Sequence, residues 1–330
     1  EMCIRDRENA GPVLGAMHDY LVNQTNTTFL ELTSAEDILC EGGKVTGVKI
    51  HQRGHEPEIV YAPYVVTAPG RGGAQWLSET VSKLGLRTQN NEVDIGVRVE
   101  VPNAIMDHLT RDLYEAKLVY YSDTYENKVR TFCMNPGGEV SQEYYEGGIA
   151  VVNGHSYEDP EKRTGNTNFA MLVSTQFTEP FNQPIEYGRY IAQLGNMLTG
   201  GPIMVQRLGD LLKGRRTDVK RLAKSTTIPT LSTAVPGDLS FVLPARHLTS
   251  IVEALKAFDH LAPGLYSQNT LLYGVEVKFY SSKVLVDNRM ETAIKGLFAA
   301  GDGAGITRGL MQAGVSGMVV ADEVARRLDS

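Results

Sequence analysis

The spacing of apolar and polar residues predicts a mixed α/β chain. The run DIGVRVEV at 94–101 alternates strictly, which predicts a half-buried strand that starts a new sheet. Two continuous apolar runs, 64–68 and 297–300, predict short strands buried on both faces. Apolar residues at helical spacing predict an amphipathic helix over 12–21 and a further helix over about 74–84.

A β-hairpin is predicted near the start of the chain. Two strand-like stretches, 29–32 and 35–39, precede the turn Glu41-Gly42-Gly43-Lys44, and a strand over 45–50 follows it. Glycine-rich turns between alternating apolar runs are a strong signal for hairpins. The polar stretch 51–58 predicts a second turn before the apolar run at 64–68.

The middle of the chain, from about 96 to 268, predicts an α+β domain. Tyr and Thr are frequent there, as in an antiparallel sheet with helices on one face. The expected strands are 117–121, 129–134, 148–152 and 169–175, and the expected helices are 184–198, 205–213 and 248–261.

Composition narrows the class of protein. The chain has 330 residues, enough for two domains, and its net charge of −7 argues against a general nucleic-acid-binding surface. No apolar run is long enough to span a membrane, so no membrane contact is expected. Two cysteines far apart, Cys40 and Cys133, make no disulfide framework, and we therefore expect a cytoplasmic protein.

The most informative motif is the glycine-rich turn after the apolar run 297–300. It contains Gly301, Asp302, Gly303 and Gly305, and a helix is expected from about Gly309 to Leu328. Glycines allow the backbone to approach a ligand closely, and the amino end of a helix favours negative charge. A carboxylate such as that of Asp302 can accept hydrogen bonds from two hydroxyls. A flavin matches both features, because the hydroxyls of its ribityl chain can donate to the carboxylate and its ring edge becomes anionic on reduction.

The segment LLYGVEVKFYSSKVLVDNRMETAIKGLFAAGDGAGITRGLMQAGVSG closely resembles the uncharacterised FAD-dependent dehydrogenase family of bacteria and archaea. The resemblance implies a split Rossmann-like FAD-binding domain of the glutathione-reductase type, with the first βαβ unit missing and an inserted α+β substrate domain. It implies FAD as the cofactor. The residues it implies for cofactor binding are Ala35, Ala68, Gly70, Arg71, Gly301, Asp302, Gly303, Gly305, Gly309, Leu310, Met311 and Gln312.

The resemblance also implies a domain plan. Residues 8–95 would form the first part of an incomplete FAD-binding domain, 96–268 the inserted substrate domain, and 269–330 the final strand, Gly-Asp motif and helix. Residues 1–7 resemble a translated transposon-end adapter used to prepare sequencing libraries. We therefore expect an N-terminally truncated metagenomic fragment that lacks the usual GxGxxG segment and binds FAD poorly unaided.

An alternative reading remains for the first glycine turn. A strand, then Gly70-Arg71-Gly72-Gly73, a helix, and Glu92 or Asp94 about 20 residues on would resemble a first dinucleotide fingerprint. Position 75, where the third glycine should fall, is occupied by Gln75.

Candidate catalytic residues lie in the middle region. Cys133 could be a redox thiol at the flavin or a small buried hydrophobe, and Asn135 stands where the family pattern often has a second cysteine. His155, in an expected glycine turn, could donate a proton or be hydrogen-bonded in a loop. Arg215 and Arg216, in the one basic cluster, could bind an anionic substrate or a nicotinamide phosphate, or form a solvated face. No metal site is visible.

The sequence therefore predicts an FAD-dependent oxidoreductase that transfers hydride through its flavin to or from an unidentified small-molecule substrate. NADH or NADPH would be the electron donor. The alternatives are a non-catalytic flavin- or RNA-binding protein, similar to flavoproteins of tRNA modification, and an inactive fragment. The acidic balance and the lack of aromatic residues in the basic cluster argue against nucleic acid. Nothing in the sequence predicts an oligomeric state.

Overall fold

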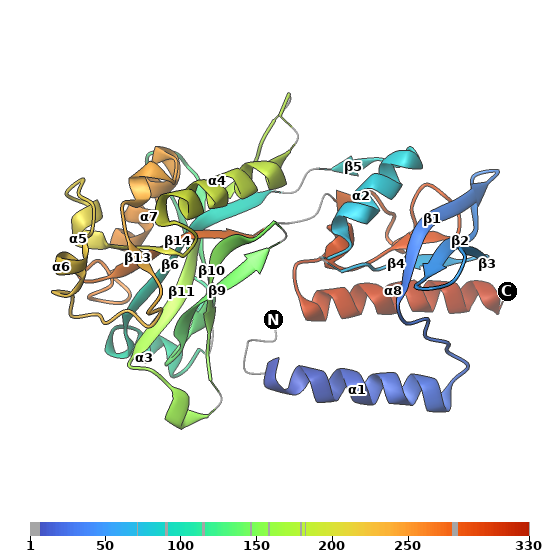
Figure 1. Cartoon of the computed structure of the whole chain (residues 1–330), viewed down its shortest axis with the longest axis horizontal. Coiled ribbons are helices and arrows are strands. Elements are labelled where there is room, and N and C mark those ends of the chain that lie inside the picture. The colour runs from blue at the N-terminus through green and yellow to red at the C-terminus, as the bar shows by residue number, and fades with distance from the viewer. Residues whose placement is uncertain are drawn as a thin grey trace. The chain divides into compact units, whose positions relative to one another are not determined.

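The computed structural model describes residues 7–70, 72–89, 92–113, 116–145, 147–157, 159–178, 180–181, 183–278 and 283–329. The backbone divides into two units, one formed by Glu1–Asn91 with Tyr280–Ser330 and one formed by Glu92–Phe279. Figure 1 shows the elements of both units. Residues 1–6 of the adapter-like segment 1–7 lie outside the described residues, as does Arg71, which was predicted to bind the cofactor.

The first unit joins elements from both ends of the chain. Its N-terminal elements are α1 (Arg7–Gln24), β1 (Thr33–Glu41), β2 (Lys44–Gln52), β3 (Glu58–Tyr61), β4 (Val65–Thr67), α2 (Ala74–Lys83) and β5 (Thr88–Gln89). Its C-terminal elements are β15 (Lys283–Val284), β16 (Leu297–Ala299), the 3-10 turn η4 (Asp302–Ala304) and α8 (Leu310–Leu328).

Strands β1, β2 and β3 form an antiparallel meander in the first unit. The predicted hairpin is confirmed, because Glu41 pairs with Lys44 across a turn in which Gly42 and Gly43 have positive φ. The expected strand over 29–32 is wrong, since these residues form an exposed loop that pairs with no strand.

Strands β4 and β16 form a two-stranded parallel sheet. The prediction of burial on both faces holds for β16, whose Leu297 and Phe298 are buried. It is wrong for β4, where Val66 is 46% exposed. Among the described residues β4 pairs only with β16, so its other edge carries no strand.

Helix α1 is longer than the predicted 12–21, and its packing differs from the expectation. An amphipathic helix should bury one face, yet Leu14, Met17 and Tyr20 are all exposed. Nowhere in the described chain is a helix both long enough and apolar enough to cross a bilayer.

The second unit is built around a large sheet. Its strands are β6 (Val93–Pro102), β7 (Val119–Tyr121), β8 (Lys128–Asn135), β9 (Glu139–Tyr145), β10 (Ile149–His155), β11 (Asn166–Thr175), β12 (Met204–Arg207), β13 (Val235–Pro236) and β14 (Leu271–Lys278). Its helices are α3 (Asn103–Thr110), α4 (Pro184–Thr199), α5 (Leu208–Leu211), α6 (Val219–Leu222) and α7 (Ala245–Phe258), with 3-10 turns η2 (Pro160–Lys162) and η3 (Leu239–Phe241).

Seven of these strands form one sheet in the order β13-β12-β14-β6-β11-β8-β7. Every pairing in it is antiparallel except that of β12 with β13. Strands β9 and β10 form a separate antiparallel pair. The predicted antiparallel sheet is therefore confirmed, and the chain has a mixed α/β fold dominated by this sheet.

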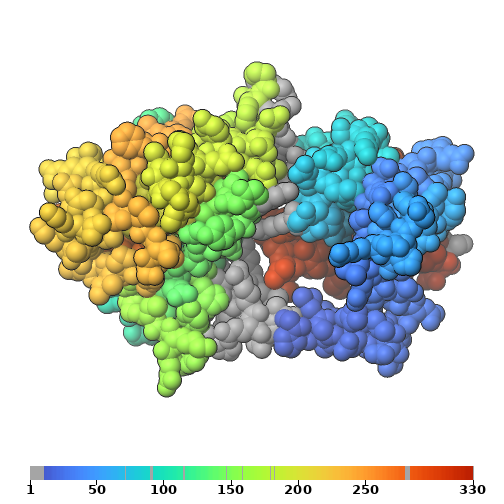
Figure 2. All heavy atoms as spheres, in the orientation of Figure 1, coloured from blue at the N-terminus to red at the C-terminus, as the bar shows by residue number. Residues whose placement is uncertain are grey.

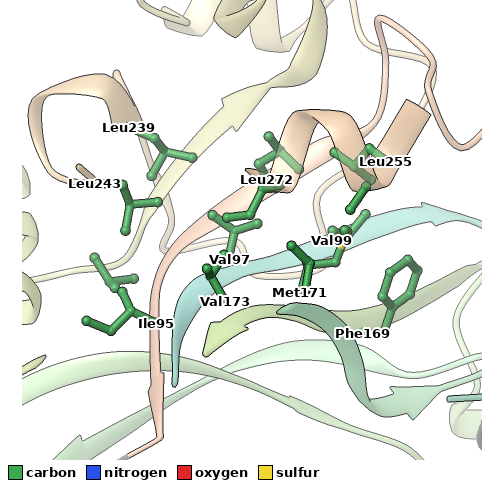
Figure 3. Packing of buried hydrophobic residues seen from close by; sticks show 14 of the residues in the cluster. Ile95, Val97, Val99, Phe169, Met171, Val173, Leu239, Leu243, Leu255 and Leu272 are labelled. Carbon is green, nitrogen blue, oxygen red and sulfur yellow. The ribbon is translucent and has the colours of Figure 1, made fainter. Parts of the chain in front are cut away.

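The apolar positions of the central strands form the main core. Figure 3 shows Val97 of β6 near Val173 of β11 and Val99 near Met171, and Ile95 and Leu255 of α7 belong to the same cluster. These side chains are almost completely buried. Burial of apolar area at about 25 cal/mol per Å² is the main source of stability for such a core.

The prediction that β6 is half-buried is wrong, because both of its faces are buried. Its polar positions Asp94, Arg98 and Glu100 are fully inaccessible. Each has charged or polar partners, such as the Arg130 guanidinium 2.6 Å from Asp94. The alternation of apolar and polar residues therefore predicted correctly which residues of β6 share a face. It did not indicate that the polar face is covered by other parts of the unit.

The expected helix over 205–213 is also wrong in part. Residues 204–207 form β12, which pairs with β14 and β13, and only the short helix α5 follows. A short apolar run fits a buried strand as well as a helix. Strand β14 belongs to this sheet, so the second unit extends past residue 268. The assignment of the regions 8–95, 96–268 and 269–330 to FAD-binding and substrate domains stays a prediction.

Candidate functional site

The two glycine-rich turns of the first unit follow two adjacent parallel strands. Val65 and Thr67 of β4 lie opposite Leu297 and Ala299 of β16. The ladder continues beyond the strands, since the Ala300 amide donates to the Thr67 carbonyl at 3.0 Å. Both turns therefore begin at the carboxyl ends of the two parallel strands. Ligands commonly bind at the carboxyl ends of the strands in open parallel sheets.

The two turns also touch. A Cβ atom at Gly303 would overlap the carbonyl oxygen of Gly70, so only glycine permits this approach of two backbones. Gly70 has φ 63°, and a Cβ placed on it would meet open space. The structure thus brings together two predicted cofactor-binding positions that are 233 residues apart in sequence.

A cavity of about 520 Å³ opens beside the first turn. Its size falls within the range of small-molecule pockets. Predicted site residues Ala35 and Ala68 both line it, from β1 and from the end of β4. The full lining is Ser34, Ala35, Ile38, Val48, Val65, Val66, Thr67, Ala68, Pro69, Gly73 and Trp76. A second cavity of about 340 Å³ is lined by Asp37, Ile38, Leu39, Cys40, Thr80, Lys83 and Leu84.

Asp302 organises the turn before α8. Its Oδ1 accepts a hydrogen bond from the Thr307 hydroxyl at 2.6 Å and from the Gly309 amide at 3.1 Å. The Gly301 amide donates to Ser316 Oγ of α8 at 3.1 Å. Asp302 lines neither of the two cavities. Its bonds to Thr307 and Gly309 show that one carboxylate oxygen stabilises the turn itself, which the sequence did not reveal.

The amino end of α8 presents the other predicted cofactor residues. The N-cap residue Gly309 supplies no side-chain hydrogen bond, and the first turn contains no acidic residue. Leu310, Met311 and Gln312 are exposed there. The first amides of a helix lack intrahelical acceptors, so this end can attract a negatively charged group.

An ion-pair cluster fixes the far end of α8. Glu323 accepts from Arg326 at 2.8 Å and from Arg327 at 2.6 Å, and Arg289 lies 2.7 Å away. Arg327 also pairs with Glu291 and lies over the Phe298 ring of β16. The cluster therefore holds α8 against the strand that precedes the glycine turn.

Hydrogen bonds from Arg326 and Arg327 lower the pKa of Glu323 from 4.5 to about 2. A lowered folded-state pKa means that the carboxylate stabilises the fold at neutral pH and loses this effect as pH falls from about 4.5 towards 2. We expect Glu323→Gln to lower the melting temperature at pH 7 and the difference from wild type to shrink with acidification. Thermal melts followed by circular dichroism across this range measure it.

Asp322→Asn is the matched control, because Asp322 is the exposed neighbour on the same helix. A melting-temperature difference for Glu323→Gln that does not change with pH, or that Asp322→Asn reproduces, would contradict the expectation.

The alternative reading of Gly70-Arg71-Gly72-Gly73 as a first dinucleotide fingerprint is wrong for the described chain. After α2 the chain enters β5, which pairs antiparallel with β15, and then β6 in the other unit. Among the residues that the structure describes, no parallel strand follows α2 to place an acidic residue beside the turn. Asp94 instead bonds Arg130 and Ser174 within the large sheet.

In the second unit, Arg98 bonds one predicted catalytic residue, Cys133, and a residue close in sequence to the other, His155. Its guanidinium pairs with Glu276 through two bonds of 2.9 Å and donates to the Cys133 carbonyl at 3.2 Å. It also donates to Asn153 at 3.3 Å, two residues before His155 in β10, and to Asn168 at 2.8 Å. The five N–H groups of one fully buried arginine thus join five strands.

His155 ends β10 and pairs with Glu139, so the expected glycine turn at this point is wrong. Gly154 is needed inside the strand because a Cβ there would overlap Arg98, Asn135 and Asn168. Cys133 is partly exposed rather than buried, and it has the left-handed φ of 48° at an irregularity of β8. The catalytic roles of Cys133 and His155 stay predictions.

Arg215 and Arg216 are exposed in the second unit and line neither cavity. Their role in substrate binding therefore also stays a prediction. Within the described residues, no group of three or more His, Cys, Asp or Glu side chains could hold a metal ion. The sequence did not reveal the group of buried bonds around Arg98, here called the Arg98 cluster. The signal that could have indicated it is the presence of Asp94, Arg98 and Glu100 on one face of β6.

Known proteins resemble the chain over much of its length. It is 28% identical over 251 residues to an uncharacterised protein of Clostridium beijerinckii, covering 71% of this chain and 46% of that protein. The chain therefore spans less than half the length of this relative.

Among solved structures, an FAD complex of glycerol-3-phosphate dehydrogenase from Bacillus halodurans is 13% identical, with 90% of this chain and 39% of that chain covered and a TM-score of 0.30. The FrdA subunit of E. coli quinol fumarate reductase is 16% identical, with coverages of 90% and 45% and a TM-score of 0.33. TM-scores below 0.5 do not establish a shared fold.

The sequence model of one family matches residues 92–279, which is more than half of the chain and comprises the whole second unit. The chain belongs to the family described as FAD-dependent protein, C-terminal domain-like.

Proposed function

We propose that the chain is part of a flavin-dependent oxidoreductase that transfers hydride to or from an unidentified small-molecule substrate. The main support is the contact between the Gly70 turn and the Gly303 turn at the ends of adjacent parallel strands, beside an apolar cavity. Membership of a family described as FAD-dependent agrees with it. NADH or NADPH is the hydride donor we propose to test.

The residues present fit an extended dinucleotide. The cavity wall formed by Ala35 and Ala68 offers small, mostly apolar contacts suited to the flat face of an adenine. The open space above Gly70 lets a pyrophosphate approach the backbone without meeting a side chain. Asp302 would accept from ribityl hydroxyls, and the amides near Met311 would face the flavin ring edge.

The chain's own contribution is electrostatic and positional. A bound flavin would supply hydride transfer, which no amino-acid side chain performs. The free amides at the start of α8 would favour negative charge beside them, because the helix dipole is fixed before any reaction occurs. The bonds from Thr307 and Gly309 to Asp302 hold the turn in place without requiring reorganisation.

We further propose that a segment of the whole protein adds a strand to the open edge of β4. Val66 is exposed on this strand, and its apolar neighbours line the cavity. An unpaired apolar edge is a site for pairing with another strand. The Clostridium beijerinckii relative, which is more than twice as long as the matched region, supplies a natural source for such a segment.

Flavin binding by two forms of the protein tests the proposal. One is the chain itself, and the other is the chain joined to the part of the Clostridium relative that it does not match. We expect the longer protein to retain flavin after desalting, seen by its visible absorbance, and the shorter one to retain little. A stoichiometric flavin complex of the short chain would refute the added strand, and a colourless longer protein that is folded would refute the flavin site.

Asp302 variants of the longer protein separate the cofactor role from the structural role. Asp302→Asn keeps an oxygen that can accept from Thr307 and Gly309 but loses the charge, whereas Asp302→Ala loses both. We expect Asp302→Asn to weaken FAD binding by about tenfold or more, as for a lost hydrogen bond to a charged group, with little change in melting temperature. Unchanged FAD affinity in Asp302→Asn would leave Asp302 only its structural role.

A further inference from the structure

One surface of the second unit carries a local charge opposite to that of the whole protein. Residues 212–224, here called the basic loop, contain six Lys and Arg residues and one acidic residue, Asp218. The complete chain has a net charge of −7. In Figure 2 the part of the chain around 200–225 forms yellow surface at one end of this unit.

The backbone of the basic loop is fixed by bonds that do not involve the side chains of Arg215 and Arg216. The Arg215 amide donates to the Asp210 carbonyl at 2.9 Å, and the Arg215 carbonyl accepts from Gln206 at 2.8 Å. The Arg216 carbonyl accepts from Arg221 at 2.6 Å. Gln206 and Asp210 are themselves buried. The loop is therefore held in one conformation.

The charged ends of this loop project into solvent. Lys213, Arg215, Arg216, Lys220 and Lys224 are exposed, and within the described chain no ion pair joins any of them to a carboxylate. Within the loop, an ion pair joins Arg221 and Asp218 at 4.0 Å. The Arg216 guanidinium donates one hydrogen bond, to the Pro236 carbonyl at 3.5 Å. An ordered backbone that carries exposed cationic side chains lowers the ordering penalty when an anionic partner binds.

Two large apolar residues of the basic loop are also exposed, each next to a lysine in the sequence. Val219 is 72% exposed and Leu212 is 43% exposed. Neither cavity of the first unit includes any residue of the loop. Apolar side chains surrounded by charged ones are typical of the centre and rim of protein–protein interfaces.

We propose that the basic loop docks an acidic segment of a partner protein, with carboxylates at Arg215 and Arg216 and apolar side chains at Leu212 and Val219. The planar guanidinium matches a carboxylate through two parallel bonds, which favours adjacent arginines on a rigid loop. Residues 212–224 contain no aromatic side chain, whereas proteins that bind single-stranded nucleic acid commonly stack bases on aromatics. The exposed aliphatic residues also fit a polypeptide better than a phosphate backbone.

The test uses the full chain and a fluorescein-labelled peptide of alternating Glu and Leu as the probe. We expect saturable binding by fluorescence anisotropy at low salt that weakens as salt increases, and little binding of a matched peptide of Gln and Leu. The double variant R215E/R216E should bind at least about tenfold more weakly. Because the loop is held through backbone atoms of these residues, the variant should keep its circular dichroism spectrum.

The control R111E/K256E makes the same change of charge at two exposed positions elsewhere in the second unit. It should leave binding within about twofold of wild type, whereas an equal loss in both variants would show a response to net charge alone. L212S/V219S should weaken binding without changing its salt dependence. Absence of peptide binding, or tighter binding of single-stranded RNA or anionic phospholipid vesicles under the same conditions, would overturn the proposal.

Discussion

Replacing Arg98 with methionine is expected to lower the free energy of unfolding by about 3 kcal/mol or more, since the buried carboxylate of Glu276 loses its two-bond partner and keeps a single cation beside it. The change would leave the carboxylate of Glu276 inaccessible to water, with Lys278 at 3.0 Å as its remaining cation. The bonds from Arg98 to strands β8, β10 and β11 would also be lost. Urea unfolding of the full chain followed by circular dichroism measures the effect.

The triple variant R98M/E276L/K278M distinguishes the charge from the hydrogen-bond network. It removes Glu276 together with both cations that pair with it, so no member of the buried ion pair is left alone, which often costs less than removing one partner. We expect the triple variant to be more stable than R98M alone. Equal losses in the two variants would show that the bonds to Asn153, Asn168 and Cys133, rather than the ion pair, account for the stabilisation.

The Arg98 cluster shows where the sequence stopped being informative about the fold. Alternation in 94–101 identified the strand and its two faces, because side chains on a strand point to opposite sides. The same pattern suggested solvent on the polar face. The covering hairpin β9–β10 and the partner Glu276, 178 positions along the chain, depend on long-range contacts that periodicity does not report.

The first unit gives the opposite lesson about the candidate site. The local signals were strong, since the apolar run, the glycines around Asp302 and the helix from Leu310 to Leu328 all lie where expected. The contact between Gly303 and Gly70 was not predictable from either turn alone, because each glycine also fits an ordinary tight turn. Exposure of β4 was missed for a similar reason, since an apolar composition does not show whether neighbouring strands are present.

The contact between the turns leads to the second large expected effect. Gly303→Ala places a Cβ atom against the carbonyl oxygen and nitrogen of Gly70, and a backbone cannot yield as a flexible side chain can. Overpacking of this kind costs about 1–3 kcal/mol. We expect a lower melting temperature for the chain and at least about tenfold weaker FAD binding in the longer protein, since the turns must separate where the pyrophosphate is proposed to lie.

Gly72→Ala is the matched control, because Gly72 lies in the first turn and a Cβ there would meet nothing within 4 Å. It should leave both the melting temperature and flavin affinity close to those of wild type. If Gly303→Ala lowers the melting temperature but leaves FAD affinity unchanged, the contact of the turns serves only the fold, and the cofactor must bind elsewhere. If both properties fall only in Gly303→Ala, the approach of two backbones from opposite ends of the chain is what creates the site.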